Sequence, residues 1–286
     1  MVLNERYYYK FKVGDIQVAK EYSKEEAILK KKQAIKKINQ MFEVLICDGK
    51  NQNLKKVYLI SKWLHSYAGY ILFEPKFVPQ RNMAYKRGNI IQVNFGFRLG
   101  SELGGVHYAV VIDKENNRSS DSITVVPMSS LKENKKVHKR DCNIGNEFYH
   151  MMQARVNGLI AQIDREYGEV HERVNTLKEL LDAMQIQQDD LEQVNDAGDK
   201  LKLLLKSAIE KNQELSEHRE LLIKTREELG YMKEGSIVKV GQIVTVSKIR
   251  IIKPKKTGDV LAGMSLSENT MKKINQKFRE IYVFEE

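Results

Sequence analysis

The sequence predicts an α+β protein: a compact β-domain with helices before it and a long helical hairpin inserted into it. Three observations point to this class. A lysine-rich helical pattern fills the first part of the chain, short β-branched runs follow, and a long heptad pattern then interrupts them before they resume. We therefore expect a basic helical region at 1–84, a β-domain made of 85–146 and 233–286, and a hairpin insertion at 147–232.

Two amphipathic helices are expected in the N-terminal region. Ser23 and Glu26 have the Ser-x-x-Glu spacing of a capping box, and they open the segment SKEEAILKKKQAIKKINQMF. Its lysines surround one apolar stripe, which fits either a solvated face or a face that contacts phosphates. A second helix is expected at 54–74. Pro75 and Pro79 then break the chain and indicate a linker.

The β-domain is predicted by runs rich in valine, isoleucine, threonine and aromatic residues. Turn residues separate these runs, as expected for short strands of a compact sheet. A final helix is expected after them, with Ser267 as its N-cap. The strand-like runs are KRGNIIQVNFGF, VHYAVVID, SITVVPMSS and GSIVKVGQIVTVSKIRIIKP.

The insertion shows an a/d heptad pattern that changes register near its midpoint. This predicts an antiparallel coiled-coil hairpin with a turn at 185–190, where Asp189 or Asp190 caps the second helix. Each arm of about 40 residues would reach about 60 Å. A rival turn at 195–200 contains Gly198 and would give unequal arms. The first seam is Val156, Ile160, Ile163, Tyr167, Val170, Val174, Leu177, Leu181 and Met184, and the second is Leu191, Val194, Leu201, Leu205, Ala208, Leu215, Leu222 and Leu229.

Charge separates the insertion from the rest of the chain. Residues 155–229 hold 11 basic and 17 acidic residues, a net charge of −6, whereas the remainder holds 37 and 21, a net charge of +16. A polyanionic partner should therefore meet the N-terminal and β-regions. The acidic hairpin is better suited to contact a protein or to support dimerisation.

Composition also limits the other function classes. The sequence lacks an apolar run long enough to cross a membrane and an N-terminal signal peptide, so we expect a cytoplasmic protein without a membrane partner. Cys47 and Cys142 have no metal-site spacing, and each is expected to be a buried, reduced thiol. Neither a metal nor another cofactor is expected.

The segment KRGNIIQVNFGFRLGSELGGVHYAVVID resembles the opening of the PemK/MazF family of bacterial toxins. SITVVPMSS, GQIVTVSKIRI and the final helix resemble later parts of that family, in the same order. The resemblance implies a small SH3-like β-barrel, commonly a homodimer, that cleaves single-stranded RNA without a metal. In such cleavage the 2′-hydroxyl attacks the phosphate and leaves 2′,3′-cyclic phosphate and 5′-hydroxyl ends. It also implies an antitoxin, either a protein segment or an RNA.

The resemblance assigns catalytic positions to His107 and Ser129. Relatives carry an arginine after the Gly-Gly loop and a threonine or serine after the Pro-Leu strand. Histidine in place of arginine supplies an acid or base that titrates near about 6.5, but it removes a permanent positive charge. Arg98, Lys132 or Arg250 could restore that charge. The predicted substrate-binding residues are Arg98, Ser101, Glu102, Tyr108, Ser130, Lys132, Gln242 and Arg250.

Other interpretations remain open from the sequence. A single histidine at the start of a strand is compatible with a structural role, whereas the glycine-rich loop and Ser129 favour catalysis. The leading hypothesis is an endoribonuclease toxin of toxin–antitoxin or phage-defence type. The alternative is a non-catalytic RNA- or protein-binding module with a coiled-coil interaction arm, and a third interpretation makes that arm a scaffold.

Overall fold

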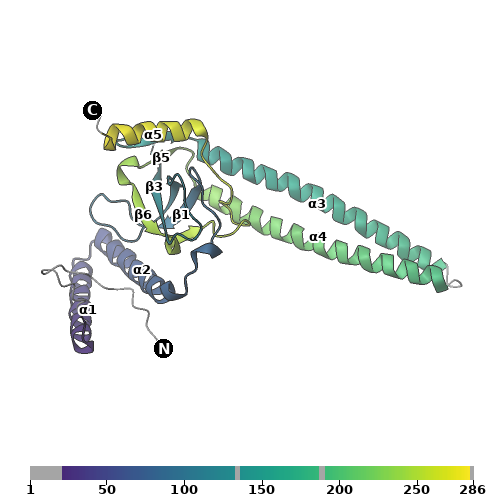
Figure 1. Cartoon of the computed structure of the whole chain (residues 1–286), viewed down its shortest axis with the longest axis horizontal. Helices are drawn as coiled ribbons and strands as arrows, with labels where there is room; N and C mark the ends of the chain where they lie inside the picture. Colours follow the sequence, from purple (N-terminus) through teal and green to yellow (C-terminus); the bar gives the residue numbers. More distant parts are fainter. Residues whose placement is uncertain (1–20, 133–135, 187–190, 284–286) are drawn as a thin grey trace, which may run out of the picture. The chain divides into compact units, whose positions relative to one another are not determined.

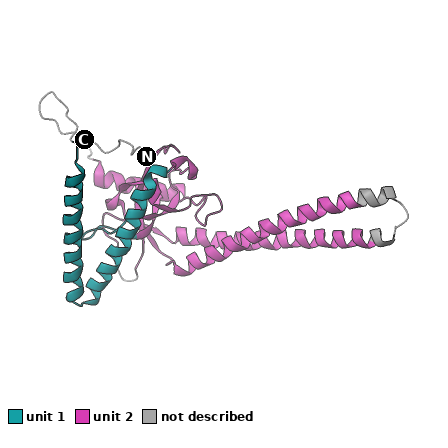
Figure 2. Ribbon diagram, turned by 90° about the horizontal axis from the view of Figure 1, so that it is seen from below, with its two compact units in different colours: residues 1–77, 96–105 teal, residues 78–95, 106–286 magenta. Residues whose placement is uncertain are grey.

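The computed structural model describes residues 21–132, 136–186 and 191–283; the side chains at 183–186 and 191–197 lie outside the description. The chain forms two compact units, drawn in different colours in Figure 2. One consists of Met1–Phe77 and Gly96–Gly105, and the other of Val78–Phe95 and Val106–Glu286. In the described part of the chain, no helix is both long and apolar enough to span a membrane.

The first unit contains the two predicted N-terminal helices, α1 (Lys24–Cys47) and α2 (Asn51–Phe73). The capping box is confirmed, because the Glu26 amide donates to Ser23 Oγ at 3.0 Å and the Glu26 carboxylate accepts from the Ser23 amide at 3.3 Å. Neither helix buries a residue. Cys47 is exposed, so the expectation of a buried thiol is wrong there, as it is the last residue of a helix that buries none of its residues.

The same unit includes the glycine-rich loop 96–105. Gly96 has a φ of 77°, and a Cβ at this position would lie 2.7 Å from the indole ring of Trp63. Only glycine satisfies both the backbone and the close approach of the ring. The Gly105 amide donates to the Gly96 carbonyl at 2.7 Å and closes the loop.

The second unit contains an antiparallel sheet of seven strands. Its order is β4-β5-β3-β2-β1-β7, and β6 pairs with β3 outside this path. Among the described residues the edge strands β4 and β7 do not pair with each other, so the sheet is open. The α+β class is confirmed, whereas closure into an SH3-like barrel is not. The strands are β1 (Ile90–Asn94), β2 (Val106–Val111), β3 (Ser122–Ser130), β4 (Cys142–Gly145), β5 (Ser236–Val238), β6 (Val244–Ser247) and β7 (Ile251–Lys253).

Side chains alternate between two apolar clusters on the faces of this sheet. Ala109 and Val111 of β2 enter one cluster, while Val110 enters the other. The cluster around Val110 also contains residues of α5 (Glu268–Tyr282) and of the hairpin base, including Met152. Ser267 caps α5 as predicted, with its Oγ accepting from the Thr270 amide at 3.3 Å. Cys142 belongs to this cluster, and burial raises the pKa of its thiol.

Short 3-10 turns connect several of these elements. They are η1 (Glu74–Lys76), η2 (Pro79–Arg81), η3 (Val240–Gln242) and η4 (Lys248–Arg250).

The insertion forms two long helices that lie side by side in antiparallel directions (Figures 1 and 2). They are α3 (Glu147–Ile186) and α4 (Leu191–Tyr231), of 40 and 41 residues. The predicted caps Asp189 and Asp190 lie outside the described residues. The rival turn at 195–200 is wrong, because α4 continues through it. The long uninterrupted helix outweighs the propensity cost of its glycine.

Packing between α3 and α4 departs from the predicted heptad seam. The predicted seam includes Tyr167 and Leu205, but they are 58% and 52% exposed. Glu166, one residue before Tyr167, is only 7% exposed instead. A regular coiled-coil interface is therefore not confirmed, although the pairing of the two helices is observed.

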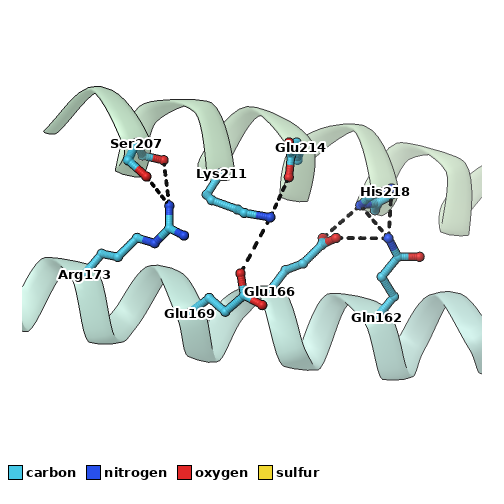
Figure 3. A network of polar contacts seen from close by, with 8 residues as sticks. All are labelled: Gln162, Glu166, Glu169, Arg173, Ser207, Lys211, Glu214 and His218. Carbon is cyan, nitrogen blue, oxygen red and sulfur yellow. Dashed lines mark hydrogen bonds and ion pairs between the residues drawn. The ribbon is translucent and has the colours of Figure 1, made fainter. Parts of the chain in front are cut away.

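Polar groups fill part of the interface between the two helices, as Figure 3 shows. Glu166 Oε2 lies 2.8 Å from Nδ1 of His218, and Gln162 donates to Glu166 Oε1 at 3.0 Å. One turn further along, Lys211 bridges Glu214 at 2.9 Å and Glu169 at 3.6 Å. The hairpin is thus held by a mixed polar and apolar interface.

Candidate active-site cleft

A cleft opens where β2 and β3 stop pairing. Their last recorded pair is Ala109 with Pro127, and β3 continues from Met128 as the partner of β5. Proline has no amide proton to donate, and the Pro127 carbonyl accepts from the Lys239 amide at 2.8 Å. If the register of β2 and β3 is continued by two residues, His107 is aligned with Ser129.

The cleft has a volume of about 380 Å³ and lies entirely within the second unit. It brings together His107, Tyr108, Ser129 and Ser130, four of the residues predicted from the sequence. His107 and Ser129 are partly exposed and Ser130 is exposed, so all three can be reached from solvent. The described lining residues are Gln92, Val106, His107, Tyr108, Met128, Ser129, Ser130, Phe148, Glu228, Tyr231, Met232, Lys233 and Ser236.

Tyr108 joins β2 to the base of the hairpin. Its ring packs edge-on against Phe148, with centroids 4.8 Å apart, and its hydroxyl donates to Glu228 Oε1. Burial, and then the hydrogen bond to this carboxylate, raise the pKa of the Tyr108 phenol far above its ordinary value. Tyr108 is therefore a neutral donor with a fixed ring, and its role as a substrate-binding residue stays a prediction.

The second oxygen of Glu228 forms an ion pair with Nζ of Lys253, from β7. The Glu228 side chain is only 14% exposed, so its two partners replace most of the water that a free carboxylate would bind. One carboxylate thus ties α4 to β2 and β7, and its charge is balanced by an adjacent ammonium.

Sequence reasoning missed the part of the cleft that the hairpin supplies. Phe148 comes from the first turn of α3, and Glu228, Tyr231 and Met232 come from α4 and the residue after it. The resemblance treated the insertion as an addition outside the β-domain. One signal was available: only a few residues separate the end of the heptad pattern from β5, which pairs with Ser129.

The other predicted site residues lie elsewhere. Lys132, Gln242 and Arg250 belong to the same unit, but they are not among the described residues that line the cleft. Lys132 is exposed after β3, Gln242 ends η3, and Arg250 Nε donates to the Asn94 carbonyl at 2.8 Å.

The remaining three predicted residues, Arg98, Ser101 and Glu102, lie in the 96–105 loop of the first unit. There Arg98 Nη1 is 3.5 Å from Glu102 Oε2, which makes an ion pair within the loop. Their roles as substrate-binding residues stay predictions.

The cleft contains the groups needed for proton transfer and for support of a charged oxygen. An imidazole can exchange a proton near neutral pH, and hydroxyl groups can donate hydrogen bonds to an anion. The described residues include no group of three or more His, Cys, Asp and Glu side chains that could hold a metal ion.

Comparison with known families adds a finding about this same segment. Residues 86–197 match the sequence model of a family described as PemK-like, MazF-like toxin of type II toxin-antitoxin system. The matched segment includes His107 and Ser129 and runs through α3 into α4. No curated protein matches the chain significantly.

Proposed function

We propose that this chain, which belongs to the PemK-like, MazF-like toxin family through residues 86–197, is an endoribonuclease of a toxin–antitoxin system. Toxins of this family act as RNA endonucleases. One observation supports the proposal for this chain: His107 and Ser129, to which the resemblance assigns catalytic positions, line one solvent-accessible cleft.

His107 acts as the general base in the proposed reaction. It takes the proton of the ribose 2′-hydroxyl, whose oxygen attacks the adjacent phosphorus while the bond from phosphorus to the 5′-oxygen breaks. A proton from water passes to the leaving 5′-oxygen and His107 returns its proton to water, so the products are a 2′,3′-cyclic phosphate and a 5′-hydroxyl. Ser129 and Ser130 donate hydrogen bonds to the phosphorane oxygens.

The finer features of the family belong to the same proposal. The β-domain, 85–146 and 233–286, would form an SH3-like nuclease that acts as a homodimer on single-stranded RNA in the cytoplasm and needs no metal. An antitoxin, either a protein segment or an RNA, would control it. The basic balance of the chain outside the hairpin supports a polyanionic substrate.

The test is cleavage of single-stranded RNA by the full chain in the presence of EDTA, with the product ends mapped. His107→Ala should lower the cleavage rate by about 10²- to 10⁴-fold, the usual contribution of a general acid or base. His171→Ala is the matched control, because this histidine is exposed on α3 and does not line the cleft.

Full cleavage activity of the His107→Ala variant would contradict the proposed role of His107 as general base. RNA that is bound but not cut by the wild-type chain would instead support the alternative of an RNA-binding module. Loss of cleavage in EDTA, restored by a divalent metal, would contradict the metal-independent reaction.

A further inference from the structure

The formal charges that line the cleft come from one place, the end of α4. Of the described lining residues, only Glu228 and Lys233 carry a full charge at neutral pH, apart from what His107 adds when protonated. Glu228 lies in the insertion, which the resemblance to the family left out of the site, and Lys233 directly follows it. The electrostatic character of the cleft is therefore set by the hairpin base.

These two charges have different environments. Glu228 is mostly buried, paired with Lys253 and hydrogen-bonded to Tyr108, so its negative charge is already balanced. Lys233 is exposed at the cleft, and no ion pair is recorded for it among the described residues. The net charge that an incoming anion meets in the cleft is therefore positive, and it comes from Lys233.

The proposed reaction needs a cation near His107 to stabilise the charge of the phosphorane. The phosphorane gains negative charge as the 2′-oxygen attacks, and a neutral imidazole that serves as base cannot offset it. The two arginines suggested from the sequence interact with other groups. Arg250 Nε donates to the Asn94 carbonyl, and Arg98 forms an ion pair with Glu102 in its own loop.

The backbone that carries Lys233 is fixed on both sides. Before it, the Met232 amide donates to the Leu229 carbonyl at 3.1 Å, and both side chains pack against the apolar cluster under the sheet. After it, Ser236 pairs with Ser130 of β3. A flexible side chain on a fixed backbone can deliver an ammonium to a phosphate with little cost in ordering the chain.

We propose that Lys233 is a catalytic residue that binds the scissile phosphate of RNA and stabilises the phosphorane. The end of the hairpin is then a wall of the active site, and Glu228 positions that wall by holding Tyr108 and Lys253. This inference rests on the proposed function, because it assigns a phosphate to the cleft.

The test compares Lys233→Gln and Lys233→Arg with Lys224→Gln in the full chain. Lys224 lies on α4, is exposed and pairs with Glu220, so it controls for a general loss of positive charge. Lys233→Gln should lower kcat/KM for single-stranded RNA by about 10²-fold, the effect of removing one donor to a developing oxyanion. Lys233→Arg should retain most of the activity, and Lys224→Gln should match the wild type.

Two further measurements separate a phosphate contact from a structural effect. The dependence of log KM on log salt should become shallower by about 0.7 in Lys233→Gln, since one phosphate contact to a single strand is lost. The pH at which the profile of kcat/KM against pH changes slope should be the same in Lys233→Gln and in the wild type, because the proposal assigns proton transfer to His107 and not to Lys233.

The outcomes distinguish this inference from the function on which it rests. A wild-type chain that does not cut RNA overturns the proposed function. A wild-type chain that cuts, with Lys233→Gln equally active, overturns only the role of Lys233. An equal loss of activity in Lys224→Gln also contradicts the role of Lys233, because the proposal depends on a charge at the cleft and not on net charge. A loss of fold in Lys233→Gln, measured by circular dichroism, contradicts it as well, because the proposal gives the exposed Lys233 side chain no packing role.

Discussion

The sheet and the hairpin of the second unit are stabilised in different ways. Ile90, Ile91 and Val110 are fully buried in the sheet, where apolar side chains fill both faces. In the middle of the hairpin the buried carboxylate of Glu166 and the partly buried imidazole of His218 occupy the interface instead. Apolar burial stabilises in proportion to area, whereas a buried polar group stabilises only while its partners remain. The sheet should therefore tolerate changes of pH that the hairpin does not.

The largest expected effect is at the place where the two regions meet. Phe148, in the first turn of α3, is 1% exposed and packs against Tyr108 and the sheet cluster. Phe148→Ala should lower the free energy of unfolding by about 3–5 kcal/mol, measured by denaturant titration and circular dichroism. Leu203→Ala, at a hairpin residue that is 71% exposed, should change it by less than about 0.5 kcal/mol. Similar values for both variants would show that the hairpin base is not part of the core.

An intermediate effect is expected within the polar interface. Glu166→Ala leaves His218 and Gln162 without their acceptor, which should destabilise the hairpin by about 1–3 kcal/mol. Hydrogen exchange should show the loss in the middle of α3 and α4 and not in the sheet. The double variant Glu166→Leu with His218→Leu should recover most of it, because it removes both ionisable partners and leaves only the partly exposed amide of Gln162, which water can solvate. A double variant as unstable as the single one would contradict this reading of the network.

Low pH should weaken the same network around Glu166. Burial alone would raise the pKa of the Glu166 carboxyl, but hydrogen bonds from His218 and Gln162, with the charges of His218 and Lys211, outweigh it and hold the pKa below the ordinary value of 4.5. The stabilisation by the ionised carboxylate is therefore complete above pH 4.5 and is lost as the pH falls through the lower pKa of the folded state. Glu166→Gln should remove this dependence from hydrogen exchange in the hairpin, while the sheet responds as in the wild type.

Most of the architecture could be predicted because it follows local patterns. The capping box at Ser23, the cap at Ser267 and the paired arms of the hairpin depend on spacings that the chain shows directly. The heptad phase was wrong at Tyr167, since Glu166 with His218 as its partner is buried there, and a pattern of apolar residues gives no signal for a buried carboxylate. Glu228 and Lys233 were missed for a related reason: their proximity to β2 depends on how the hairpin returns to the sheet.

The smallest expected effect concerns an exposed ion pair of the hairpin. It tests whether the stability that a charged group contributes depends on its burial and not only on its charge. Lys224 and Glu220 form an ion pair at 3.1 Å on the outer face of α4, with side chains 63% and 68% exposed. Water solvates both charges whether or not they meet, so Glu220→Gln should change the free energy of unfolding by less than about 0.5 kcal/mol, measured by the same denaturant titration. Glu166→Ala removes a carboxylate from the same hairpin, but one that water cannot replace. Equal losses in the two variants would mean that net charge, and not the burial of the Glu166 carboxylate, stabilises the hairpin.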